Sequence, residues 1–85
     1  MASVEEAVRD FIVTNFLFGD QERLASNDES LLAQGIIDST GVLELVFFLE
    51  TTYGIQVDAS ELIPANLDSI NKAAAFVERK TAALK

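Results

Sequence analysis

Asp38 and Ser39 are the residues whose types and position are best suited to chemistry, because they stand where the apolar pattern predicts the start of a helix. Backbone amides at a helix start have no partner within the helix, and the helix dipole is positive there. A phosphate ester on the Ser39 hydroxyl would therefore be well placed. Asp38 could help to bind a metal ion carried by a modifying enzyme. Asp and Ser are also ordinary residues at helix starts, so the pair alone is weak support for a modification site.

The chain lacks the residues that catalysis at such a serine requires. It contains no histidine and no cysteine, which excludes Ser-His and Cys-His nucleophilic machinery, disulfides, and zinc sites built on these residues. No two carboxylates have a spacing suited to acid–base catalysis. The Asp-x-Asp-x-Asp-Gly ladder of a calcium-binding loop is also missing. We therefore expect that the protein is not an enzyme and that an outside catalyst would have to modify Ser39.

Charge is distributed unevenly along the chain. Fourteen acidic side chains stand against six basic ones, a formal net charge of −8, and no Lys or Arg occurs between Arg23 and Lys72. The middle of the domain should therefore carry most of the negative potential. Nucleic acid and anionic membrane surfaces would be repelled, so neither is an expected partner, whereas proteins with basic patches are. Simple solubility would also account for the net charge, which alone does not decide between the two explanations.

The apolar periodicity predicts an all-α fold, a small four-helix bundle with three major helices and one short helix. A single domain is expected over residues 1–85, because the chain is too short for a second core. The helices are predicted at about residues 3–18, 38–53, 58–63 and 68–84. A long loop at 20–37 joins the first two helices, and residues 55–57 are expected to be extended without pairing as a strand.

Capping residues mark the expected helix boundaries. The residues that should begin helices are Ser3 with Glu6 as a capping box, then Asp38, and one of Asn66, Asp68 and Ser69. The residues that should end helices are Gly19, Gly54 and Pro64. Gly41 lies inside the second helix, where glycine costs about 1 kcal/mol relative to alanine, so it indicates close approach by another group.

Apolar residues indicate which parts of each element face the core. The long loop should be held to the core by Leu24, Leu31, Leu32, Ile36 and Ile37. The second helix is expected to be central, because its apolar residues cover a broad surface: Val42, Leu43, Leu45, Val46, Phe47, Leu49 and Tyr53. The inner face of the last helix should consist of Ile70, Ala73, Ala74, Val77 and Leu84.

The stretch from Gly35 to Val57, GIIDSTGVLELVFFLETTYGIQV, resembles the modification-site helix of acyl carrier proteins. In that family a glycine and apolar residues precede Asp-Ser, and an apolar-acidic helix, an aromatic residue and an extended segment follow. Residues 67–70 and 73–77 resemble the entry to the family's final helix. The resemblance covers nearly the whole chain. The length, the acidity and the expected helix order of this chain also agree with the family.

This resemblance implies a role for each matching residue. Ser39 aligns with the serine that receives 4'-phosphopantetheine from coenzyme A, and Asp38 aligns with the acidic residue that supports this Mg²⁺-dependent modification. Glu44 and Glu50 align with acidic positions that partner enzymes bind through Arg or Lys, although a solvated helix face would explain them as well. Thr40 departs from the family, which usually has Leu or another apolar residue there, and suggests a specialised set of partners.

The resemblance also implies the mechanism and the partners. A phosphopantetheinyl transferase would attach the arm, with Mg²⁺ needed only for that step, and the thiol of the arm would carry an acyl group as a thioester. A loading ligase and downstream acyltransferases or synthases with basic docking patches would act on the loaded protein. We also expect a monomer. A cytoplasmic location is expected too, because the absence of cysteine permits it and the N-terminus has no recognisable secretory signal.

Two other functions stay open on the sequence. The Gly-Ile-Ile-Asp-Ser form also resembles aminoacyl and D-alanyl carriers, which are served by adenylating ligases. A non-enzymatic helical adaptor for a basic partner, with Ser39 as a simple cap, is the alternative from another class. The cargo of a carrier is also undetermined, because Phe47 and Phe48 could fill the space between the helices and restrict it to short groups.

Overall fold

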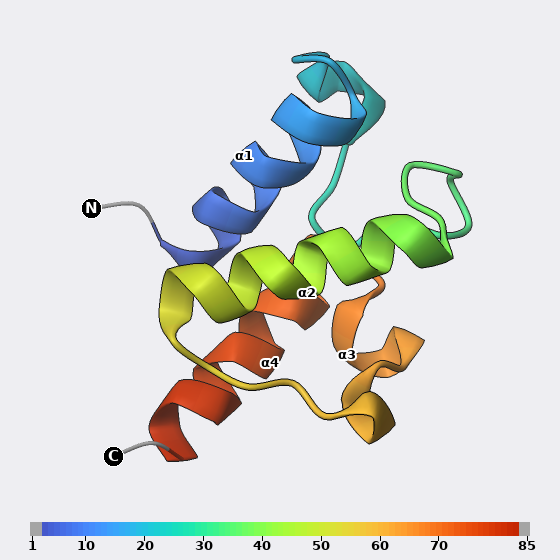
Figure 1. Ribbon diagram of the computed structural model, residues 1–85. Coiled ribbons are helices and arrows are strands. Elements are labelled where there is room, and N and C mark those ends of the chain that lie inside the picture. The colour runs from blue at the N-terminus through green and yellow to red at the C-terminus, as the bar shows by residue number, and fades with distance from the viewer. Residues whose placement is uncertain (1–2, 84–85) are drawn as a thin grey trace.

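The computed structural model describes residues 3–83 and shows a bundle of helices (Figure 1). Its elements are α1 (Val4–Phe16), η1 (Gln21–Arg23), α2 (Ser39–Tyr53), η2 (Ala59–Glu61), α3 (Pro64–Leu67) and α4 (Ile70–Ala83), where η denotes a 3₁₀ turn. No strand occurs in the described range. The predicted all-α class, with three long helices, one short helix and a long loop between α1 and α2, is confirmed. None of these helices has the length and apolar character needed to cross a membrane.

The predicted cap at the start of α1 is present in a modified form. The Ser3 hydroxyl oxygen accepts a hydrogen bond from the Glu6 amide at 3.1 Å, but the Glu6 carboxylate accepts from the Ser3 hydroxyl at 3.3 Å rather than from the Ser3 amide. The helix ends two residues earlier than expected, and the Gly19 amide closes it by donating to the carbonyl of Val13 at 2.9 Å. Gly19 has a φ of +87°, which glycine tolerates without strain.

The predicted bounds of α2 are confirmed. The Asp38 carboxylate accepts a hydrogen bond from the Gly41 amide at 2.8 Å, and Gly54 ends the helix at a φ of +67°. A Cβ at Gly41 would lie 3.1 Å from the Cβ of Ile37 and 3.1 Å from the Cε1 of Phe16. This glycine therefore lets the start of α2 approach the end of α1, as its position in the sequence indicates.

The expectation that the second helix is central is wrong. α4 contacts α1, α2 and α3, and so occupies the middle of the bundle. α2 buries Leu45, Val46 and Leu49, but Leu43 is 57% exposed and Phe47 is 70% exposed. One side of this apolar helix therefore faces solvent.

The inner face of α4 follows the prediction and extends it. Its buried residues include Ile70, Ala73, Ala74 and Val77 as expected, together with Phe76. Leu84 lies outside the described residues. The N-cap is Ser69, whose hydroxyl oxygen accepts a hydrogen bond from the Lys72 amide at 3.0 Å.

The segment before α4 corrects the prediction for Pro64. Residues 55–57 are extended and unpaired as expected, and η2 supplies the predicted turn. Pro64 does not end that turn but begins α3, because its fixed φ suits the first position of a helix and its missing amide is not needed there. Proline is common both just after one helix and at the first position of the next, and the prediction assigned Pro64 to the wrong one of these two positions.

The long loop is anchored by apolar and polar contacts. Its Leu24, Leu31, Ile36 and Ile37 are buried as predicted, whereas Leu32 is exposed and the expectation for it is wrong. The Arg9 guanidinium of α1 donates hydrogen bonds to the side chain of Asn27 at 2.8 Å and to the carbonyls of Gln21 and Leu24. These acceptors lie in the first half of the loop, so one side chain holds that part in place.

Candidate functional site at the start of α2

Ser39 is exposed and is the first residue of α2. The first hydrogen bond of the helix runs from the Val42 amide to the Asp38 carbonyl at 2.9 Å, so the amides of Ser39 and Thr40 precede the bonded turns. Asp38 is also exposed, and one of its carboxylate oxygens caps the helix. The two residues predicted to support modification are therefore side by side on the surface.

Buried residues immediately before Asp38 fix the position of this helix start. The amides of Ile36 and Ile37 both donate to the carbonyl of Leu31, at 2.9 and 3.3 Å, and both side chains are buried. Gly35 makes the preceding turn with a φ of +70°. The chain thus passes from an anchored apolar pair directly to the exposed Ser39.

An apolar groove of about 200 Å³ adjoins Ser39 on one side of α2. Its walls come from the long loop, from α2 and from the segment that contains η2 and α3. The residues that line it are Leu32, Ser39, Val42, Leu62, Ile63, Pro64, Leu67 and Asp68. The exposed Leu32, which we expected in the core, therefore forms part of this wall.

A larger hollow of about 550 Å³ lies on the other side of α2, between α1 and α2. Its floor contains Phe11 and Phe48, whose rings stack with centroids 4.4 Å apart. The exposed Leu43 and Phe47 stand at its edge. Phe47 does not fill the space between the helices, contrary to one possibility raised by the sequence, and Phe48 is half-buried against α1.

Known carrier proteins are similar to this chain over most of its length. The probable acyl carrier protein PigG of Serratia sp. (strain ATCC 39006) is 30% identical over 76 residues, which cover 89% of this chain and 86% of the relative. The D-alanyl carrier protein of Streptococcus pyogenes serotype M1 is 33% identical over 76 residues, which cover 89% of this chain and 92% of the relative. This chain belongs to the acyl carrier protein family. No protein-family model matches it.

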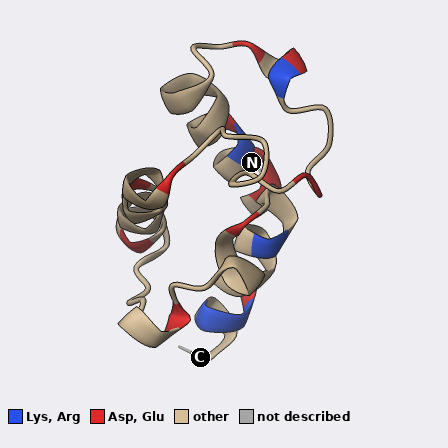
Figure 2. Cartoon of the chain, turned by 90° about the vertical axis from the view of Figure 1, so that its right-hand side faces the viewer, with Lys and Arg blue, Asp and Glu red and all other residues tan. Residues whose placement is uncertain are grey.

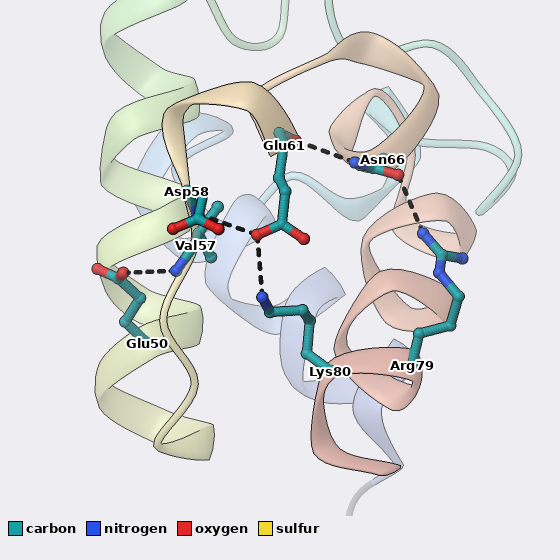
Figure 3. Close-up of polar contacts among 7 residues, drawn as sticks. All are labelled: Glu50, Val57, Asp58, Glu61, Asn66, Arg79 and Lys80. Atoms are coloured by element: carbon teal, nitrogen blue, oxygen red, sulfur yellow. Dashed lines mark hydrogen bonds and ion pairs between the residues drawn. The ribbon is translucent and has the colours of Figure 1, made fainter. Parts of the chain in front are cut away.

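Two of the three predicted partner-binding residues of the carrier protein lie together, and the third lies elsewhere. Thr40 and Glu44 are exposed and both line the hollow between α1 and α2. Glu50 is half-buried, and its carboxylate accepts a hydrogen bond from the Val57 amide at 3.0 Å (Figure 3). Glu50 therefore has a structural task, holding the extended segment against α2, which the helical pattern gave no means of detecting.

Within the described chain, the basic residues of the carrier protein are confined to a few elements, whereas acidic residues occur throughout. Figure 2 shows that α2 and the loop directly before it, residues 24–38, carry acidic residues alone among their charged residues, whereas α1, η1 and α4 carry both acidic and basic residues. Several basic groups already have partners within the molecule: Arg9 binds the long loop, and Arg79 and Lys80 bind the segment before α4. The surface around Ser39 is accordingly acidic and apolar. Within residues 3–83, no three His, Cys, Asp or Glu side chains gather to hold a metal ion.

Proposed function

We propose that this carrier protein receives a 4'-phosphopantetheine group on the Oγ of Ser39 and carries acyl groups between the enzymes of a biosynthetic pathway. The observation that supports this most is the exposed serine at the first position of α2, directly after an acidic cap, in a chain whose relatives are carrier proteins. The proposal assigns no catalytic step to the chain, which contains neither histidine nor cysteine.

The residues around Ser39 fit such a group at both of its ends. A phosphate on Ser39 would lie at a helix start, near backbone amides that precede the bonded turns. The apolar residues Val42, Leu62 and Ile63 in the adjoining groove would contact the less polar part of the arm. Asp38 uses its Oδ1 for the cap, and within the described part of the chain its Oδ2 accepts no hydrogen bond, which leaves that oxygen for Mg²⁺ during modification.

The attachment step forms one bond and breaks another. The Ser39 oxygen bonds to the phosphorus that carries the pantetheine of coenzyme A, adenosine 3',5'-bisphosphate leaves, and the serine proton passes to a base of the transferase. The attached group supplies the thiol that this chain lacks and on which an acyl group is held as a thioester. The chain itself holds Ser39 at the surface and provides a surface on which enzymes dock.

Docking would use the face of α2 that borders the hollow between α1 and α2. Leu43 and Phe47 present apolar surface there, and Glu44 presents a negative charge beside them. A transferase, a loading ligase or a downstream acyltransferase would match this face with an apolar side chain next to Arg or Lys. Such contacts should be weak, because a carrier must leave after each step.

An aminoacyl or D-alanyl cargo is the second candidate. Two observations favour it: the similarity to D-alanyl carrier proteins at 33% identity, and the Gly-Ile-Ile-Asp-Ser form of residues 35–39, which resembles aminoacyl and D-alanyl carriers. This alternative uses the same serine and arm but a ligase that activates an amino acid. The intact mass of the protein isolated from its host distinguishes the two, because the mass reports the cargo.

The decisive experiment measures mass after incubation with coenzyme A, Mg²⁺ and a broad-specificity phosphopantetheinyl transferase. The wild-type protein should gain about 340 Da, the mass of the arm, and Ser39→Ala should gain nothing while keeping its helical circular dichroism. Ser60→Ala is the matched control, since Ser60 is also exposed and makes no side-chain hydrogen bond among the described residues. An unmodified wild type, with the transferase active on another carrier, would favour the adaptor instead.

A further inference from the structure

The wall of the groove that faces α2 is built from short helical turns rather than from a long helix. It lies in residues 58–67, whose only helices are η2 and α3, of three and four residues. Helices this short are not stable by themselves in water. Leu67 is the buried apolar residue of this wall, whereas Ile63 is 45% exposed. The wall must therefore be positioned largely by its contacts with other elements.

Polar contacts from α4 hold this wall (Figure 3). The Glu61 Oε1 accepts hydrogen bonds from the Lys80 ammonium at 2.9 Å and from the Asp58 amide at 3.0 Å. The Glu61 carbonyl accepts from the Asn66 side-chain amide at 3.0 Å, and the Asn66 oxygen accepts from the Arg79 guanidinium at 3.0 Å. Two consecutive cations of α4 thus reach the wall at separate points.

Both cations are themselves held in place. The Arg79 guanidinium carbon and the Lys80 nitrogen lie 5.8 and 6.0 Å from the ring centre of the buried Phe76, within the range of cation–π attraction. Glu61–Lys80 is the one ion pair within residues 3–83. The hydrogen bond from the Asp58 backbone, followed by that from Lys80, holds the pKa of Glu61 below its usual range. Glu61 is therefore charged at neutral pH.

We infer that Glu61 and Lys80 are positioning residues that fix the wall at 58–67 and so set the width of the groove beside Ser39. The part of this inference that concerns the arm rests on the proposed function. Without the ion pair, the wall would keep Leu67 in the core but could move relative to α2. The side chains of Lys80 and Glu61 are 26% and 27% exposed, and an ion pair that solvent reaches contributes little to global stability. Its loss should therefore appear as local opening of this segment and not as unfolding of the bundle.

Hydrogen exchange of the full chain, followed by mass spectrometry or NMR, tests the positioning role. The test variants are Glu61→Gln, which removes the charge but keeps an acceptor, and Lys80→Met, which keeps most of the aliphatic stem. The matched controls are Lys80→Arg, which keeps the cation, and Glu78→Gln. Glu78 is exposed on α4, and its carboxylate makes no hydrogen bond or ion pair among the described residues.

The expected result is a local change. Amides of residues 62–68 should exchange about two- to fivefold faster in both test variants, the range expected for an ion pair that solvent reaches, while the two controls match the wild type. Amides in the buried part of α1, around Ile12, should be unchanged. Equal exchange at 62–68 in test and control variants would overturn the inference, and so would an equal acceleration in α1.

A second measurement reports on the groove itself. A pantetheine bearing an environment-sensitive fluorophore is transferred to Ser39 in each variant, and its emission is compared. The emission of the two test variants should move toward that of the free dye in water, while both controls match the wild type. Labelling without a difference between variants overturns the inference. Failure to label the wild type overturns the proposed function instead, and the exchange measurement, which needs no label, still decides the role of Glu61 and Lys80.

Discussion

The carboxylate of Asp68 accepts a hydrogen bond from the backbone amide of Leu32 at 2.9 Å, across 36 positions of sequence. Its other oxygen accepts from the Ser30 hydroxyl, and the Asp68 carbonyl accepts from the Leu31 amide at 2.9 Å. Asp68 lies between α3 and α4, whereas the other three residues belong to the long loop. This one residue therefore joins two walls of the groove beside Ser39.

Replacing Asp68 should destabilise the protein in proportion to the hydrogen bonds that are lost. Asp68→Ala removes both side-chain acceptors and should lower the free energy of unfolding by about 1–3 kcal/mol. Asp68→Asn should cost less, because the amide oxygen can still accept from the Leu32 amide. Urea denaturation measures both effects. Asp10→Ala is the control, since Asp10 is exposed on α1 and makes no side-chain hydrogen bond within residues 3–83, and equal losses in the two alanine variants would contradict this account.

Substitutions of Asp38 should separate its capping role from its proposed role in modification. Asp38→Ala removes the acceptor for the Gly41 amide and should lower the free energy of unfolding by about 1 kcal/mol. Asp38→Ser keeps a capping oxygen and should be nearly as stable as the wild type, but it lacks the carboxylate. We therefore expect both variants to be modified more slowly by the transferase, as followed by intact mass. If Asp38→Ser were modified at the wild-type rate, the proposed role of Asp38 in modification would be refuted and only its capping role would remain.

Changing the charge of Glu44 should weaken docking without affecting the fold. Glu44→Gln should raise the KM of a phosphopantetheinyl transferase about two- to fivefold, the range that an exposed charge pair corresponds to, and Glu44→Lys should raise it further, with the melting temperature unchanged. The difference from the wild type should diminish in about 1 M salt, where the Debye length falls to about 3 Å. Glu78→Gln and Glu78→Lys carry the same changes on α4, and an equal rise of KM in these variants would refute a specific role for Glu44.

The ionisation of Glu61 should make the positioning of the groove wall dependent on pH. The pKa of Glu61 is lower in the folded than in the unfolded protein, so its ionised form stabilises the fold above the unfolded pKa, and this contribution is lost as pH falls through the folded pKa. An NMR titration of the side-chain carboxyl carbon should give a midpoint below that of glutamate in an unfolded peptide. Lys80→Met should raise the midpoint only partly, because the Asp58 hydrogen bond remains. A midpoint at the peptide value in the wild type would contradict this prediction.

Local signals in the sequence were sufficient to place the candidate site. The Asp38 cap, the stop at Gly54 and the buried pair Ile36 and Ile37 each act through neighbouring backbone, and they fix the start of α2 without knowledge of the other helices. The exposure of Ser39 follows from that start. The same reasoning predicted the close approach at Gly41, because glycine inside a helix needs a packing reason.

Features that depend on tertiary packing could not be predicted in this way. α2 is apolar on most of its surface, so its periodicity does not show that Leu43 and Phe47 face solvent. The burial of Phe76 on α4 also depends on how the helices pack, and it was not predicted from the sequence. The hydrogen bonds of Glu50 and Glu61 join segments that meet only in the folded chain, and the two residues have the same local appearance in the sequence as solvated glutamates.

Arg9, Arg79 and Lys80 bind other residues of the same chain, and this affects how ions distribute around the protein. Because these cations already have partners in the fold, they do little to neutralise the acidic side chains near α2, and mobile cations from the solution must gather there instead. A protein that brings its own fixed cations to α2 would return those ions to bulk solvent. Part of the free energy of such an encounter would then be the mixing entropy of small ions, which requires no change in the shape of either molecule.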